Sequence, residues 1–133
     1  MGADLSYVNE IQDYNGIYRD SGIIADPFKI FKDHGANVIR VRLWNNPAWM
    51  AELTGGKIYS NLDDVEKTIR RAKEAGMAVS LDLHYSDTWA DPQNQGIPAA
   101  WQGLGLEALS DSLYSFTFNT LQYLKSKDLT PEI

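Results

Sequence analysis

Two segments of this chain, residues 37–44 and 77–84, alternate apolar and polar side chains, and this alternation limits the possible folds more than any other feature. A period of two is typical of a β-strand whose two faces meet different surroundings. In the second segment the two faces are Val79, Leu81 and Leu83 on one side and Ser80, Asp82 and His84 on the other. Each segment therefore predicts a strand with one face in a core and the other near polar groups.

Helix signals follow each predicted strand. A weaker strand pattern at 2–8 precedes a helix that should begin at Pro27 and run to about His34, because Asp26 is a strong N-cap and Pro favours the first helical position. Further helices are predicted over about 61–75, where acidic residues precede basic ones, and over about 106–126. Repeated strand–helix order predicts a parallel sheet with right-handed crossovers.

The unlike strand faces indicate which kind of parallel sheet forms. A doubly wound sheet has helices on both faces, so its strands are continuously apolar. A barrel can carry polar residues on its inner face, toward an active site at the C-terminal ends of the strands. We therefore expect an α/β fold made of the first three βα units of a (β/α)8 TIM barrel, truncated before strand four. A whole barrel needs about 250 residues, so a chain of 133 residues is expected to be a fragment.

Charge and composition narrow the possible partners. The formal net charge is −6, whereas nucleic acids and anionic membranes attract basic surfaces, so we expect neither as a partner and favour a neutral substrate. The absence of cysteine excludes disulfides and thiolate metal sites. No glycine pattern for phosphate follows a predicted strand, and no cofactor is expected. The sequence has neither a membrane-spanning apolar run nor a signal peptide at its start.

Arginines on the polar face of the first of these segments are candidate site residues. Arg40 and Arg42 share that face, and a buried arginine needs a partner because an unpaired buried charge is costly. Asp82, on the neighbouring predicted strand, is the natural partner. Arg40 therefore belongs either to a structural ion pair or to the site, and Arg42, which is nearer the C-terminal end of its strand, is the better site candidate.

The end of the second segment and the loop after it carry further polar groups. Asp82 and His84 can bind a substrate hydroxyl or orient a catalytic carboxylate. Together with Asp87 and Asp91 they could also bind a metal ion, although an Asp-x-His pair is weak evidence for one.

Tryptophans also lie near the predicted strand ends. Trp44, Trp89 and Trp101 fall at a strand end or in loops. Each could be an ordinary core residue. Several indoles after strands also fit stacking on a sugar ring, whose apolar C–H face packs well on an aromatic surface.

Five segments together resemble the N-terminal part of the endo-β-1,4-galactanases of glycoside hydrolase family 53. They are GADLS at 2–6, NVIRVRLWNNP at 37–47, AGM at 75–77, DLHYSDTWADP at 82–92 and PAAW at 98–101. The resemblance covers nearly the whole chain and is most specific at 82–92. It implies that residues 1–133 are the N-terminal part of a single (β/α)8 glycosidase catalytic domain.

The resemblance also implies a retaining endo-glycosidase that hydrolyses β-1,4-galactan, a side chain of pectin, and that is secreted or held at the cell surface. The family's acid/base Glu follows strand four and its nucleophile Glu lies on strand seven. Both are expected beyond Ile133, so the chain alone should be inactive and contain no catalytic residue. Substrate-binding residues are expected to be Arg42, Asp82, His84, Trp89 and Asp91, with supporting roles for Arg40, Trp44 and Asp87 and no metal ligands.

Two other functions remain open from the sequence. One is a partial barrel that binds galactan, or has only a structural role, without cutting the polymer. The other is a metal-dependent hydrolase centred on Asp82, His84, Asp87 and Asp91. Whatever the function, three βα units leave the outer edge of the strand at 77–84 unpaired. We therefore expect the isolated chain to be marginally stable and to self-associate, or to occur only as one piece of a larger polypeptide.

Overall fold

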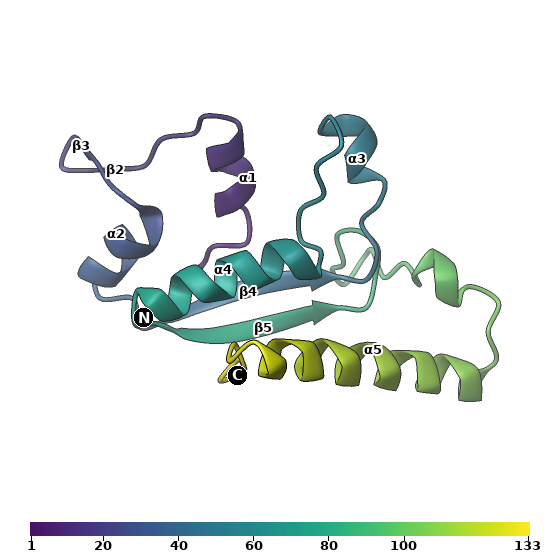
Figure 1. Ribbon diagram of the computed structural model, residues 1–133. Helices are drawn as coiled ribbons and strands as arrows, with labels where there is room; N and C mark the ends of the chain where they lie inside the picture. The colour runs from purple at the N-terminus through teal and green to yellow at the C-terminus, as the bar shows by residue number, and fades with distance from the viewer.

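A computed structural model describes all residues from Met1 to Ile133. Its main sheet has three parallel strands in the order β1-β4-β5 (Figure 1). The strands are β1 (Gly2–Asp4), β4 (Val38–Trp44) and β5 (Ala78–His84). In the register of the sheet Asp4 lies beside Arg40, and Arg42 lies beside Asp82. The predicted parallel sheet is therefore present, and its polar residues fall in line across neighbouring strands.

The longer helices follow the strands as the sequence predicts. They are α2 (Pro27–Asp33), α4 (Leu62–Glu74) and α5 (Leu106–Ser126). The carboxylate of Asp26 accepts hydrogen bonds from the first turn of α2, and Asn61 Oδ1 accepts from Asp64 N at 3.0 Å to begin α4. These side chains satisfy backbone N–H groups that have no partner within the helix.

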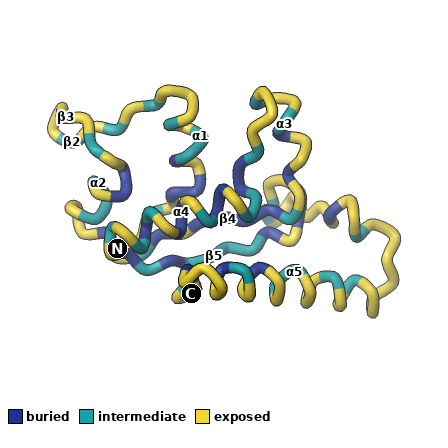
Figure 2. Tube along the Cα trace, in the orientation of Figure 1, coloured by how far each residue is buried: buried dark blue, intermediate teal, exposed yellow.

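The core lies between α4 and the sheet. Val65, Ile69 and Ala72 of α4 belong to one buried cluster with Ile39 of β4 and Val79 of β5, and all five are fully buried. Full burial of each valine or isoleucine side chain stabilises the fold by about 1.5–3 kcal/mol. The helix α5 runs along β5 and contributes Leu124 to the same buried cluster, and most of its other residues are exposed (Figure 1 and Figure 2).

The first strand is shorter than predicted, since β1 ends at Asp4 and helix α1 (Val8–Asp13) already begins at Val8. The side chain of Asp4 explains this end. Its Oδ1 accepts hydrogen bonds from Ser6 N at 3.0 Å and Ser6 Oγ at 2.6 Å, and such local bonds turn the chain out of an extended path.

Short elements occupy the connecting loops. They are the hairpin β2 (Arg19–Asp20) and β3 (Ile23–Ile24), the helix α3 (Met50–Leu53) and the 3-10 turn η1 (Ala99–Trp101). None of the helices has the length and apolar character needed to cross a membrane.

The last residues of the chain pair with the outer edge of β5. Glu132 N and Ile133 N donate to Val79 O at 3.0 and 3.1 Å, and Leu81 N donates to Ile133 O at 2.9 Å. The edge of β5 is therefore covered over part of its length, whereas the sequence predicts a wholly unpaired edge.

Candidate functional site

An open hollow lies at the C-terminal end of β5, where active sites of parallel α/β folds are found. Its volume is about 530 Å³. Its walls come from the polar face of the sheet and from the loop at 85–97. The polar residues that line it are Arg40, Asp82, His84, Ser86, Asp91 and Gln95.

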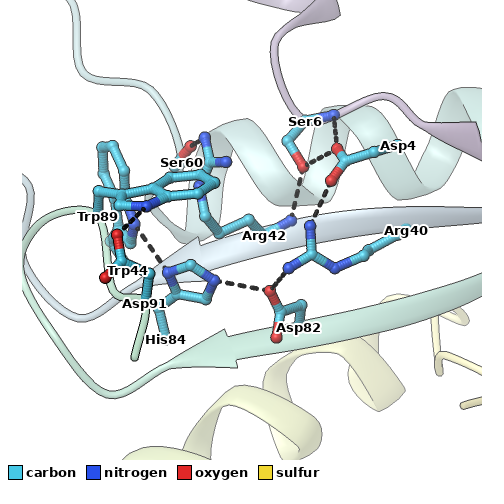
Figure 3. Close-up of polar contacts among 10 residues, drawn as sticks. All are labelled: Asp4, Ser6, Arg40, Arg42, Trp44, Ser60, Asp82, His84, Trp89 and Asp91. Carbon is cyan, nitrogen blue, oxygen red and sulfur yellow. Dashed lines mark hydrogen bonds and ion pairs between the residues drawn. The ribbon is translucent and has the colours of Figure 1, made fainter. Parts of the chain in front are cut away.

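A charged network crosses the three strands beside this hollow. Arg40 bridges two carboxylates, with Nη1 donating to Asp4 and Nη2 donating to Asp82 (Figure 3). The same oxygen of Asp82 lies 2.7 Å from His84 Nε2. The ion pair expected between Arg40 and Asp82 is therefore present, and Asp4 is a second partner that the sequence did not suggest.

The network alters the acidity of Asp4. Partial burial by itself raises the pKa of this carboxyl, but the hydrogen bonds from Ser6 and the guanidinium of Arg40 outweigh it and hold the pKa below its usual value. The ionised form of Asp4 is thus favoured, and it binds the guanidinium of Arg40.

Arg42 has very different surroundings. It is 1% exposed, and its Nη2 donates to Ser60 Oγ at 3.3 Å. Its Nε is buried without a hydrogen-bond partner, and no carboxylate lies within ion-pair distance. Asp82, the partner expected for the arginines of this face, therefore pairs with Arg40 and not with Arg42.

Aromatic rings take the place of an acidic partner around Arg42. The guanidinium carbon lies 4.5 Å from the ring centre of Tyr7, 4.7 Å from that of Trp44 and 5.1 Å from that of Trp89. Contacts of this kind attract a cation through the ring quadrupole. The result is a buried cation that still has hydrogen-bonding capacity (Figure 3).

Trp44, His84 and Trp89 pack against one another at the end of the strands. Trp44 Nε1 lies 3.3 Å from His84 Nδ1, and the ring of Trp89 meets that of His84 edge-on at 5.8 Å. Trp44 is 4% exposed, so it cannot be a stacking surface for a ligand. Trp89 is 46% exposed and offers such a surface at this position.

The two loop aspartates bind backbone groups. Asp87 accepts from Asn46 N at 3.0 Å and from Ala99 N at 2.8 Å, which ties the loops after β4 and β5 together. Asp91 accepts from Gln93 N and Asn94 N within its own loop, and from Trp89 Nε1 at 3.0 Å. The hydrogen bond from Gln93, followed by that from Asn94, lowers the pKa of Asp91.

The four residues considered as metal ligands, Asp82, His84, Asp87 and Asp91, do not form a metal-binding cluster. No group of three or more His, Cys, Asp and Glu side chains is arranged to hold a metal ion. Trp101 also lies apart from the hollow, in η1, where its ring meets Phe116 of α5 at 6.0 Å. Of the eight residues singled out from the sequence, four line the hollow: Arg40, Asp82, His84 and Asp91. The other four, Arg42, Trp44, Asp87 and Trp89, are not among its lining residues.

Several residues of the site were missed from the sequence. Tyr7 and Ser60 touch Arg42, and Asp4 holds Arg40. Asp4 could have been found from its place at the end of a parallel strand, but the register that sets it beside Arg40 has no sequence signal. Ser60 is recognisable only in the structure, where it has a φ of 57° and its hydroxyl accepts a hydrogen bond from Arg42.

The sequence profile of glycosyl hydrolase family 53 matches residues 1–133. The chain is 48% identical to an arabinogalactan endo-β-1,4-galactanase of Cellvibrio japonicus (strain Ueda107), covering 100% of this chain and 34% of that protein. It is 40% identical to an endo-β-1,4-galactanase of Bacillus subtilis (strain 168), covering 91% of this chain and 28% of that protein. The chain thus spans about a third of the length of these relatives.

Solved structures of this family also superimpose on the chain. A structure from a study of two fungal β-1,4-galactanases superimposes with a TM-score of 0.86 at 34% identity, over 99% of this chain and 37% of that one. The GH53 catalytic domain of Ignisphaera aggregans gives a TM-score of 0.86 at 35% identity, over 98% and 36%. The expected fold, three βα units of a (β/α)8 barrel, is confirmed. The chain belongs to glycosyl hydrolase family 53.

Proposed function

We propose that this chain takes part in the hydrolysis of β-1,4-galactan by providing one wall of the substrate cleft. The names of its relatives support the substrate. In this proposal residues 1–133 are the N-terminal part of a single glycosidase catalytic domain, which acts outside the cell or at its surface. Arg42, Asp82, His84, Trp89 and Asp91 line the substrate side, and Arg40, Trp44 and Asp87 support them.

The observation that carries the proposal is the hollow beside an exposed indole and a set of fixed polar groups. A galactosyl unit is neutral, has an apolar C–H face and carries several hydroxyl groups. The exposed face of Trp89 suits the first property. Asp82 suits the hydroxyls, since its Oδ2 is held by Arg40 and His84 while its Oδ1 accepts no hydrogen bond within the chain.

The carboxylates of the inner face are unsuited to cleavage by themselves. Glycoside hydrolysis generally needs one carboxyl as acid and another as nucleophile or base. Asp4 and Asp82 are both bound to Arg40, and the pKa of Asp4 is lowered, which is opposite to what a general acid needs. Residues 1–133 should therefore bind galactan without cutting it.

Tryptophan fluorescence titrated with β-1,4-galacto-oligosaccharides tests binding. We expect a saturable change in emission, and a Trp89→Ala variant should bind about two- to tenfold more weakly, the range that one aromatic contact contributes. Trp101→Ala is the matched control, because Trp101 packs against Phe116 of α5 and does not line the hollow. Equal affinity of the Trp89→Ala variant and the wild type would contradict the proposed site.

A reducing-sugar assay on β-1,4-galactan tests the second half of the proposal. Purified chain 1–133 should release no sugar above a buffer blank. Activity that follows the protein peak through purification would show that the chain contains catalytic carboxyls of its own, and would overturn the division of roles.

A further inference from the structure

The imidazole of His84 is held at both nitrogens, and the two partners differ in what they can do. Nδ1 lies 3.3 Å from Trp44 Nε1, and Nε2 lies 2.7 Å from Asp82 Oδ2 (Figure 3). The ring is 8% exposed, so water does not compete freely for either contact.

An indole nitrogen carries a hydrogen and has no free lone pair, so it can only donate a hydrogen bond. If His84 Nδ1 carried a proton, it and the indole N–H of Trp44 would both be donors facing one another, and neither would have an acceptor. A carboxylate, by contrast, can only accept, so Asp82 calls for a proton on Nε2. Both contacts are satisfied together by one form of the ring, with Nδ1 bare and Nε2 protonated.

We propose that Trp44 is a positioning residue that fixes His84 as the neutral Nε2–H tautomer. Asp82 alone would accept either this tautomer or the doubly protonated ring, since both carry a proton on Nε2. The N–H of Trp44 excludes the doubly protonated ring, because it needs an acceptor at Nδ1. The oxygen of Asp82 that contacts His84 Nε2 is itself held in place by Arg40.

The neutral Nε2–H tautomer leaves Asp82 with one oxygen free for a ligand. With both nitrogens engaged, His84 serves as a fixed bridge between Trp44 and Asp82, and the free oxygen of Asp82 becomes the acceptor that this cluster can offer to a ligand. The chain from Trp44 through His84, Asp82 and Arg40 to Asp4 then orients that oxygen from both sides.

Long-range ¹H–¹⁵N NMR on the full chain labelled with ¹⁵N-histidine tests the proposal without any ligand, because the two ring nitrogens report directly which one carries a proton. The chain has two histidines. His34 is exposed and pairs with Asp20, so a His34→Gln variant assigns the signals without touching the site. At neutral pH we expect a bare Nδ1 and a protonated Nε2 for His84. A proton on Nδ1, in either the other tautomer or the doubly protonated ring, would overturn the proposal.

Variants then separate Trp44 from Asp82. Trp44→Phe keeps an aromatic ring beside Arg42 but removes the N–H donor, so a measurable share of the molecules should gain a proton on His84 Nδ1. Trp101→Phe makes the same chemical change away from His84 and should leave the wild-type spectrum. If Trp44→Phe, with a folded backbone spectrum, also leaves it unchanged, Asp82 alone sets the tautomer and Trp44 has no such role. Because no sugar is present, failure here is distinguishable from failure of the galactan proposal.

Discussion

The position of the Arg42 side chain depends on Asp64, which does not contact it directly. Its Nη2 binds the hydroxyl of Ser60, and Ser60 has the left-handed backbone that non-glycine residues rarely adopt. Two bonds hold Ser60 there. Trp44 N donates to Ser60 O at 2.8 Å, and Ser60 N donates to Asp64 Oδ2 at 2.8 Å. The placement of a buried cation thus rests on a carboxylate at the start of α4.

Replacing Asp64 by Ala should therefore destabilise the fold. Asp64 is 5% exposed, and its loss leaves the N–H of Ser60 without its acceptor and removes one of the acceptors of the Asn9 amide. We expect the free energy of unfolding to fall by about 1–3 kcal/mol, the cost of such unpaired groups. Urea unfolding measures this. Asp63→Ala, one position earlier and exposed, should cost only a few tenths of a kcal/mol through the helix dipole. Similar losses in both variants would contradict this role of Asp64.

The lowered pKa of Asp4 makes the free energy of unfolding depend on pH. Its folded-state pKa lies below the unfolded value of about 3.9, so its ionised form stabilises the fold. That contribution is complete above the unfolded pKa and is lost as the pH falls through the folded one. Asp4→Asn should lower the free energy of unfolding at neutral pH by about 1 kcal/mol, allowing for the exposure of the pair, and by less in acid.

Urea unfolding between neutral pH and about pH 3 measures this difference. Asp111→Asn is the control, because Asp111 is exposed on α5 and makes no ion pair. A constant difference between the Asp4→Asn variant and the wild type across that range would show that Asp4 has no linked proton.

At the scale of elements, the loops after β4 and β5 form one unit. Asn45 N donates to Ser86 O at 2.8 Å, and Trp49 Nε1 donates to Asp87 O at 2.9 Å. Asp87 completes the unit, since its two carboxylate oxygens bind Asn46 N and Ala99 N. The floor of the hollow is thus set by the strands, and the position of its loop wall depends on Asp87.

Asp87→Ala should loosen that wall while leaving the core intact. Two backbone N–H groups lose their acceptor, so the loop at 85–98 should be cut faster in limited proteolysis, with a loss of about 1–2 kcal/mol in global stability. Gln95→Ala is the matched control, because Gln95 lies in the same loop and its side chain makes no hydrogen bond. Equal cleavage rates for the Asp87→Ala variant and the wild type would show that other contacts hold the loop.

At the scale of the whole molecule, the outer side of β5 is open. The tail pairs with β5 only as far as Leu81. Beside it runs an apolar groove of about 490 Å³, lined by residues of β5, α5 and the tail. Its apolar residues are Leu81, Leu83, Phe118, Leu121, Pro131 and Ile133. An exposed strand edge next to apolar surface is a template for association between chains.

We therefore expect the isolated chain to self-associate. Light scattering at several concentrations should give a mass above the 14.9 kDa of one chain, rising with concentration. Phe118→Lys places a charge in the groove at a position already 47% exposed and should shift the protein toward monomer. Leu106→Lys, at a position that is 85% exposed and outside the groove, should not. A monodisperse monomer for the wild type at all concentrations would contradict the expectation.

Much of the architecture could be predicted from the sequence because it depends on local chemistry. The N-caps at Asp26 and Asn61, the alternation in β4 and β5, and the span of α5 all follow from nearby residues. The parallel order of the strands follows from the repetition of strand and helix. The first strand was predicted too long because the turn that ends it depends on one hydrogen-bonded pair, Asp4 and Ser6.

The partners within the site were decided only by the tertiary structure. The sequence placed Arg40, Arg42 and Asp82 on one face. The register sets Arg42 beside Asp82, but the packing of aromatic rings encloses Arg42, and Arg40 binds the carboxylate. The same holds for Trp44, which a strand-end position left open to a ligand and which packing buries against His84. Local propensity fixes which side chains share a face, whereas each polar pair forms between residues far apart in the chain, whose contact depends on how the strands align and what the loops cover.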